Sequence, residues 1–168
     1  MLSDKPGWEA EGRDWPNRTQ SRFVDVGRLR WHVQVAGSGP VLLLLHGTGA
    51  ATHSWRAMLP LLAEHFTVVA PDLPGHGFTT GRPMSSMAKA VGELMTALEI
   101  PPALIVGHSA GAAIAIRMVL DGFAAPRGVI GLNSALLPFP GLAAKLFPTL
   151  ARMLFVIPFA LHIFAGIE

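Results

Sequence analysis

The amino-acid sequence predicts an α/β fold with a mostly parallel, doubly wound sheet. Short apolar runs alternate along the chain with segments of helical spacing. One of these runs leads directly into a glycine-flanked serine at 107–111, and a further helical pattern follows it. Strands that alternate with helices imply right-handed crossovers between parallel strands. A chain of 168 residues is long enough for one domain with a sizeable core.

Composition excludes several classes of protein. Hydrophobic residues make up 51% and charged residues 14% of the chain, against about 25% charged in an average soluble domain, so the chain is not disordered. The net charge is only +2 and the arginines are scattered, which gives no reason to expect a nucleic-acid partner. The chain has no cysteine, so disulfides, thiolate zinc sites and cysteine nucleophiles are excluded. We expect a cytoplasmic protein.

The two ends of the chain differ from the middle in composition. Residues 1–20 are polar and lack the apolar stretch of a secretory signal, so we expect a loosely ordered leader. Residues 21–137 are expected to form the core, and residues 138–168 the apolar start of a cap. Within that tail, 153–167 is apolar but shorter than the roughly 20 residues that span a bilayer. A buried or interfacial helix is therefore expected, with peripheral membrane contact as an alternative.

The sheet is expected to begin with an antiparallel hairpin. Residues 23–26 and 29–36 are short alternating runs separated by Gly27 and Arg28. The run 41–45 is apolar on both faces, which is typical of a central parallel strand. One face of the second hairpin strand should carry Trp31, Val33 and Val35.

The remaining elements follow in alternation. Residues 54–65 have helical spacing despite Pro60, with Trp55, Met58, Leu61 and Leu62 on one side. Further strands are expected at 66–70, 103–106 and 128–132. Further helices are expected at 85–99 and at 112–120, the latter closed by Gly122.

The segment Gly107-His108-Ser109-Ala110-Gly111 matches the G-x-S-x-G nucleophile elbow. A serine hydroxyl is a poor nucleophile at neutral pH, so it must be exposed at a strand end, beside a base and facing amide donors. Gly107 and Gly111 leave the space that a strained turn needs between the strand and the helix. Ser109 is therefore the predicted catalytic nucleophile.

A second glycine loop, His46-Gly47-Thr48-Gly49, follows the strand at 41–45. In sites with this elbow, one oxyanion donor follows the nucleophile and the other comes from an upstream loop. We expect the oxyanion hole to consist of the backbone N–H groups of Thr48 and Ala110. The alternative is that these glycines only make a strand-to-helix turn.

Most of the seven histidines are expected to be structural. His108 precedes the nucleophile, and its ring should point away from the serine. His46 and His76 lie in glycine loops and should bind local backbone groups. Surface positions are predicted for His32, His53 and His65. None of the histidines has metal-ligand spacing with another, so no metal and no cofactor is predicted.

A triad built on this elbow requires the chain order Ser, then Asp or Glu, then His. The chain has no suitable acid and base in that order. Asp72 precedes Ser109 and is predicted to cap a loop. Asp121 lies at the far end of the helix that follows the elbow. The remaining candidates, His162 and Glu168, occur in the wrong order. The chain predicts a nucleophile and an oxyanion hole without the base that would activate them.

Segments 46–50, 71–77 and 107–111 together resemble the α/β-hydrolase superfamily, in particular its cofactor-free haloperoxidase-like and esterase-like branch. More narrowly, the chain resembles the magnesium-chelatase accessory proteins of bacteriochlorophyll biosynthesis, over segments 14–18, 29–34, 47–55 and 132–139. The resemblance implies a role in the magnesium branch of tetrapyrrole synthesis in a phototrophic bacterium. Members of that family continue well beyond the equivalent of Glu168, so this chain resembles an N-terminal fragment that stops inside the cap.

Two classes of function follow. The first is an esterase-like serine hydrolase in which Ser109 attacks an acyl carbon while the Thr48 and Ala110 amides hold the oxyanion. The second is non-enzymatic: the apolar tail at 138–167 would line a tetrapyrrole pocket or dock on magnesium chelatase, or the chain would be an inactive fragment. A dehalogenase or epoxide hydrolase is disfavoured, because those relatives carry Asp where this chain has Ser109. Whether the chain is an enzyme stays open.

Overall fold

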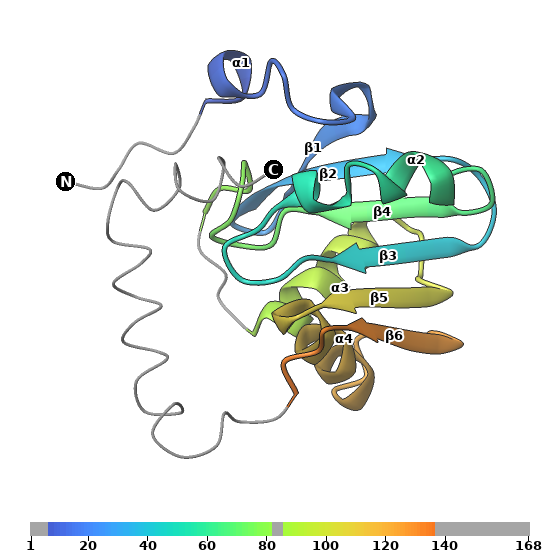
Figure 1. Cartoon of the computed structure of the whole chain (residues 1–168). Coiled ribbons are helices and arrows are strands. Elements are labelled where there is room, and N and C mark those ends of the chain that lie inside the picture. The colour runs from blue at the N-terminus through green and yellow to red at the C-terminus, as the bar shows by residue number, and fades with distance from the viewer. Residues whose placement is uncertain (1–6, 82–85, 137–168) are drawn as a thin grey trace, which may run out of the picture. The chain divides into compact units, whose positions relative to one another are not determined.

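The computed structural model describes residues 7–81 and 86–136, and these residues form a six-stranded sheet with helices on both faces (Figure 1). The strand order is β1-β2-β4-β3-β5-β6. Three neighbouring pairs, β4 with β3, β3 with β5 and β5 with β6, are parallel. The predicted α/β class and mostly parallel sheet are confirmed.

The predicted hairpin forms the first edge of the sheet. Strand β1 (Ser21–Val26) pairs antiparallel with β2 (Leu29–Ala36), and Gly27 takes a φ of 60° in the turn between them. Strand β2 then pairs antiparallel with β4 (Thr67–Pro71). Trp31 and Val33 are fully buried in one cluster and Val35 packs against it, as the alternation predicted.

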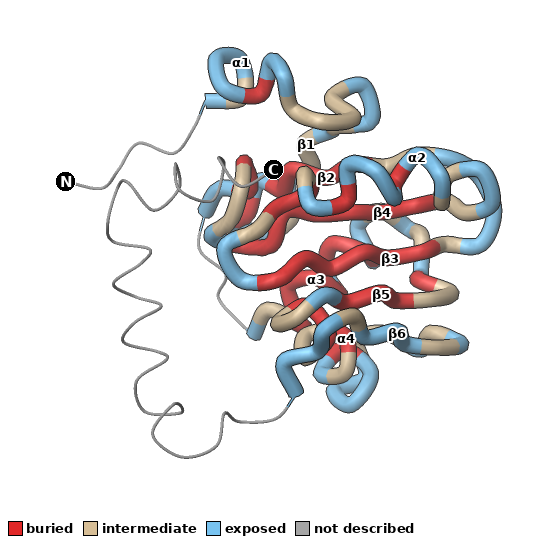
Figure 2. The backbone as a smooth tube through the Cα atoms, viewed as in Figure 1, coloured by how far each residue is buried: buried red, intermediate tan, exposed pale blue. Residues whose placement is uncertain are grey.

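The parallel strands form the centre and the second edge. Strand β3 (Val41–Leu45) lies between β4 and β5 (Leu104–His108), with Leu43 paired to Val69 on one side and to Ile105 on the other. Strand β6 (Gly128–Leu132) pairs with β5. Figure 2 shows burial concentrated on the central strands and exposure along β6. Apolar residues on both faces of β3 are buried because the sheet is covered on both sides.

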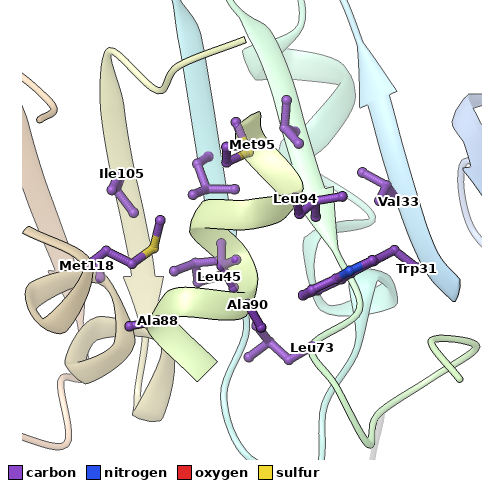
Figure 3. Close-up of a cluster of buried hydrophobic side chains, with 14 of the residues drawn as sticks. Trp31, Val33, Leu45, Leu73, Ala88, Ala90, Leu94, Met95, Ile105 and Met118 are labelled. Carbon is purple, nitrogen blue, oxygen red and sulfur yellow. The ribbon is translucent and has the colours of Figure 1, made fainter. Parts of the chain in front are cut away.

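Two helices cover one face of the sheet. Helix α3 (Met87–Ala97) begins where the Ser86 hydroxyl accepts the N–H of Lys89 at 3.2 Å. Helix α4 (Ala110–Leu120) ends before Gly122, which has a φ of 74°. Figure 3 shows the cluster between these helices and the sheet, with Trp31, Val33, Leu45, Leu73, Ala88, Ala90, Leu94, Met95, Ile105 and Met118 labelled.

The other face is covered by the 3-10 turn η2 (Thr52–Trp55) and the short helix α2 (Met58–Leu62). The expectation of one helix over 54–65 is therefore wrong. Pro60 has no N–H to donate, and it fits only in the first turn of a helix, which is where a start at Met58 places it. Trp55 and Leu59 are buried against the sheet, whereas Met58 and Leu61 are 40% and 65% exposed.

Residues 7–20, which belong to the predicted leader, contact the hairpin and the 3-10 turn η2. Helix α1 (Trp8–Glu11) places the Trp8 ring edge-on to Phe23, with 5.5 Å between centroids. The 3-10 turn η1 (Arg18–Gln20) leads into β1. The indole N–H of Trp15 donates to Thr52 Oγ1 at 2.9 Å. The predicted cap at 138–168 lies outside the described residues.

No helix within residues 7–81 and 86–136 has the length and apolar character needed to cross a bilayer.

Candidate functional site

The loops that carry the predicted site residues follow the carboxyl ends of the parallel strands. Because β3, β4, β5 and β6 run in the same direction, these ends share one edge of the sheet (Figure 1). The loop after β3 contains Thr48, the loop after β4 contains Asp72, and Ser109 follows β5. This edge is where open α/β sheets bind their ligands.

Ser109 occupies a strained turn between β5 and α4. Its φ of 52° and ψ of −117° lie in a region that residues with a side chain rarely adopt. Two hydrogen bonds to the end of β6 and the segment after it hold it there: its N–H donates to the carbonyl of Leu132 at 2.9 Å, and its carbonyl accepts the N–H of Ala135 at 3.2 Å. Both bonds fix the direction in which the serine leaves the strand.

The two glycines of the elbow have the space-saving role that the motif predicts. A Cβ at Gly107 would lie 2.4 Å from the backbone nitrogen of Ala112, and a Cβ at Gly111 would lie 2.2 Å from the carbonyl oxygen of Leu45. A third glycine, Gly47, faces the serine directly, because a Cβ there would lie 3.1 Å from the Cβ of Ser109. The loop after β3 therefore approaches the elbow closely.

The two predicted oxyanion donors are neighbours in sequence of Gly47 and Ser109, the two residues that approach each other. Ala110 is the first residue of α4, and Thr48 is exposed in the loop next to Gly47. Within the described residues neither backbone N–H has a hydrogen-bond acceptor. The start of α4 also places the positive end of the helix dipole at the elbow, where negative charge is favoured.

His46 fastens the loop after β3 to the loop after β4. Its Nε2 accepts the N–H of Leu73 at 2.9 Å, so Nδ1 carries the proton and donates to the carbonyl of Gly47 at 2.8 Å. Burial lowers the pKa of His46 to about 4, with the nearby His76 acting in the same direction. His76 bonds the carbonyl of Pro74 at 3.3 Å. The predicted backbone contacts of both rings are confirmed.

Asp72 fastens three segments from a fully buried position. Its carboxylate accepts the N–H of Thr52 at 2.7 Å and that of Phe78 at 2.9 Å, and it lies 2.7 Å from His32 Nδ1. Burial alone raises the pKa of Asp72, but the hydrogen bond and charge of His32 with the two N–H groups outweigh it and lower the pKa. The prediction that Asp72 caps a loop is confirmed.

The surface position expected for His32 is wrong. Its ring is fully buried, with Nδ1 on Asp72 and Nε2 3.0 Å from Ser21 Oγ. The reason is that Trp8 and Phe78 cover the face of the hairpin opposite to Trp31, with ring centroids 4.8 and 5.5 Å from His32. His53 is half-buried against Trp15, and burial lowers its pKa, whereas His65 is exposed as predicted.

No general base for Ser109 occurs in the described part of the chain, where its hydroxyl has no hydrogen-bond partner. His108 is exposed beside Gly47, and its Nδ1 lies 3.2 Å from the position of a Cβ there. Asp121, at the end of α4, pairs with Arg117 at 2.6 Å. His162 and Glu168 lie outside the described residues.

A hollow of about 350 Å³ lies at the opposite end of the strands, lined by Asn17, Gln20, Ala36, Gly37, Leu59, Pro60, Ala63 and Glu64. Ala36 ends β2, which runs antiparallel to β4, so this hollow adjoins the amino end of β4 rather than the elbow. It holds no residue of the predicted site.

Comparison with known proteins identifies the family. Residues 40–154 match the family model of the alpha/beta hydrolase fold. The chain belongs to the α/β-hydrolase fold family. Among curated proteins it is 44% identical over 153 residues to the magnesium-chelatase 30 kDa subunit of Rhodobacter capsulatus, covering 87% of this chain and 53% of that protein. This confirms the resemblance seen in the sequence.

The chain is also similar to proteins with other names. A fluoroacetate dehalogenase from a Burkholderia species is 40% identical over 111 residues, which is 61% of this chain and 36% of that protein. A crystal structure of a candidate lipase from Acinetobacter baumannii superposes with a TM-score of 0.71 at 26% identity, covering 80% of this chain and 48% of that one. The α/β-hydrolase chain spans about half the length of its magnesium-chelatase relative.

Proposed function

We propose that this α/β-hydrolase chain carries the nucleophile and the oxyanion hole of an esterase-like serine hydrolase. The observation that supports the proposal most is the conformation of Ser109, which is held at a φ of 52° between a strand and a helix. Such strain persists only where surrounding contacts impose it, and it is typical of functional sites. At this turn it presents the hydroxyl at the edge of the sheet, where substrates of this fold bind.

The reaction would begin with attack of Ser109 Oγ on the acyl carbon of an ester. The carbonyl oxygen would take up the electron pair and accept the N–H groups of Thr48 and Ala110, which have no other acceptor among the described residues. The hydroxyl proton would pass to a base supplied from outside the described residues and then to the alcohol, which leaves as the tetrahedral intermediate collapses to the acyl-enzyme; water would then release the acid from Ser109. Each oxyanion donor typically contributes about 10²–10³-fold in rate.

We further propose that this chemistry serves bacteriochlorophyll synthesis alongside magnesium chelatase, with an acyl-bearing tetrapyrrole or another small acyl compound as the substrate. Support comes from the 44% identity to a protein named as a magnesium-chelatase subunit. The alignment covers 87% of this chain. A non-enzymatic role beside the chelatase is the second candidate, and it is favoured by the lack of a base for Ser109 in the described residues.

Pigment synthesis separates these two candidates. The gene would be replaced in a phototrophic host by the variant Ser109→Ala, with Ser54→Ala as a matched control at an exposed serine in η2. If the protein acts as a hydrolase, bacteriochlorophyll falls to the level of the gene deletion in the first strain and stays normal in the second. Normal pigment in the Ser109→Ala strain, with loss in the deletion, would instead support the non-enzymatic role.

A further inference from the structure

We propose that Ser21 is a second activated hydroxyl, which forms a covalent adduct with acyl or phosphonyl donors independently of Ser109. Ser21 Oγ lies 3.0 Å from His32 Nε2, and His32 Nδ1 lies 2.7 Å from Asp72 Oδ2. A nucleophile, a base and a carboxylate that orients the base are thus connected in the order that serine hydrolases use. Such a site is recognised by geometry and not by position in the sequence.

The hydrogen bonds of Asp72 define which nitrogen of the neutral His32 imidazole carries the proton. Its carboxylate accepts the N–H groups of Thr52 and Phe78 at 2.7 and 2.9 Å, so it is held as an acceptor. The third bond of this carboxylate must then come from a proton on His32 Nδ1. In the neutral ring this leaves Nε2 as an acceptor for the hydroxyl proton of Ser21.

The surroundings of His32 suit the cation that forms when it takes this proton. The Asp72 carboxylate lies within 2.7 Å as the counter-charge. The Trp8 and Phe23 rings pack beside the imidazole, with centroids 4.8 and 5.4 Å from its own. The ring is fully buried, so water does not weaken these interactions.

Ser21 itself is less buried than its two partners, which are fully buried. It is only partly buried and begins β1, the edge strand of the sheet. Gln34 Nε2 donates to its Oγ at 3.2 Å and would stabilise negative charge there. The N–H of Ser21 donates to the carbonyl of Arg18 and cannot serve as an oxyanion donor. We therefore expect a slow reaction that stops at the adduct.

A fluorophosphonate serves as the probe. Ser21 Oγ attacks phosphorus, an O–P bond forms, the P–F bond breaks and fluoride leaves. The hydroxyl proton passes to His32 Nε2 and then to solvent, while Asp72 stays ionised throughout. The purified chain would be digested with trypsin, which places Ser21 on the peptide 19–22 and Ser109 on the peptide 90–117, each as the only serine. Tandem mass spectrometry then locates the adduct.

The expected result is an adduct on 19–22 that forms at least about 100-fold faster than any adduct at the exposed Ser54, since a positioned base contributes about 10²–10⁴-fold. The adduct should persist in Ser109→Ala, vanish in Ser21→Ala and slow by a similar factor in His32→Gln. Circular dichroism checks that each variant is folded. Ser21→Ala leaves the His32–Asp72 pair intact, so it tests the proposal even if His32→Gln does not fold.

Two results would overturn the proposal: no adduct at Ser21 in the folded chain, or modification of Ser21 no faster than that of Ser54. An adduct at Ser109 alone would support the proposed hydrolase and overturn this inference. An adduct at Ser21 alone would support this inference and leave the hydrolase to its own test.

Discussion

The imidazole of His46 accepts the backbone N–H of Leu73 at 2.9 Å and so joins the loop after β3 to the loop after β4. The same ring donates to the carbonyl of Gly47, the residue that packs against Ser109. Protonation of Nε2 would remove the acceptor for Leu73. The placement of the proposed oxyanion loop therefore depends on a neutral histidine.

This dependence predicts how stability changes with pH. The pKa of His46 is about 4 in the fold against 6.5 ordinarily, so its contribution is fully present above about pH 6.5 and is lost as the pH falls towards about 4. We expect His46→Gln, which cannot take up a proton, to lose less stability than the parent between pH 7 and pH 5. Urea denaturation at both values measures this, and equal losses in the two proteins would contradict it.

The close approach at Gly111 predicts a large effect from one methyl group. A Cβ added at Gly111 would lie 2.2 Å from the carbonyl oxygen of Leu45, a backbone atom that cannot move without shifting β3. We expect Gly111→Ala to lower the free energy of unfolding by about 3 kcal/mol or more. Gly128→Ala is the matched control, because its nearest contact is a leucine methyl at 3.4 Å. Similar melting temperatures for the two variants would refute the packing described at the elbow.

Relief of the backbone strain at Ser109 is predicted to stabilise the fold. Glycine adopts a φ of 52° readily, whereas alanine keeps the strain. We expect Ser109→Gly to be about 1 kcal/mol more stable than Ser109→Ala, since strain of about 1–3 kcal/mol is partly offset by the greater freedom of the unfolded glycine chain. Chemical denaturation of the two variants gives the difference. A glycine variant no more stable than the alanine variant would show that the turn is unstrained.

The buried Asp72 carboxylate predicts a fourth stability effect. Asp72→Asn places an NH2 group where the carboxylate accepts from Thr52, Phe78 and His32, so one donor loses its partner. Breaking a buried pair costs about 3–5 kcal/mol. Asp121→Asn, which removes a partly exposed partner of Arg117, should cost about 1 kcal/mol or less. Thermal denaturation of both variants compares them, and equal losses would mean that the Asp72 network contributes little.

The elbow could be predicted from the sequence because its determinants are local. Gly107, Ser109 and Gly111 lie within five residues, so one short segment identifies the turn, although the atom that a Cβ at Gly111 would meet belongs to the distant Leu45. The strands could also be predicted, since apolar runs such as 41–45 form buried strands of nearly the same extent.

The burial of His32 could not be predicted in this way. Alternation along β2 places His32 opposite Trp31 and Val33, a position that faces water in a sheet covered on one side only. The residues that cover it, Trp8 and Phe78, come from distant parts of the chain. Its partner Asp72 lies 40 residues away, and nothing in the local sequence links the two.

Fluorophosphonate labelling of the whole product of the gene, with the adduct located by mass spectrometry, shows directly whether Ser109 is a nucleophile. We expect an adduct on the peptide 90–117 that disappears in Ser109→Ala and forms about 10²–10³-fold more slowly when Thr48→Pro removes one oxyanion donor. An unlabelled Ser109 in the folded protein, under conditions that label a known serine hydrolase fully, would contradict it.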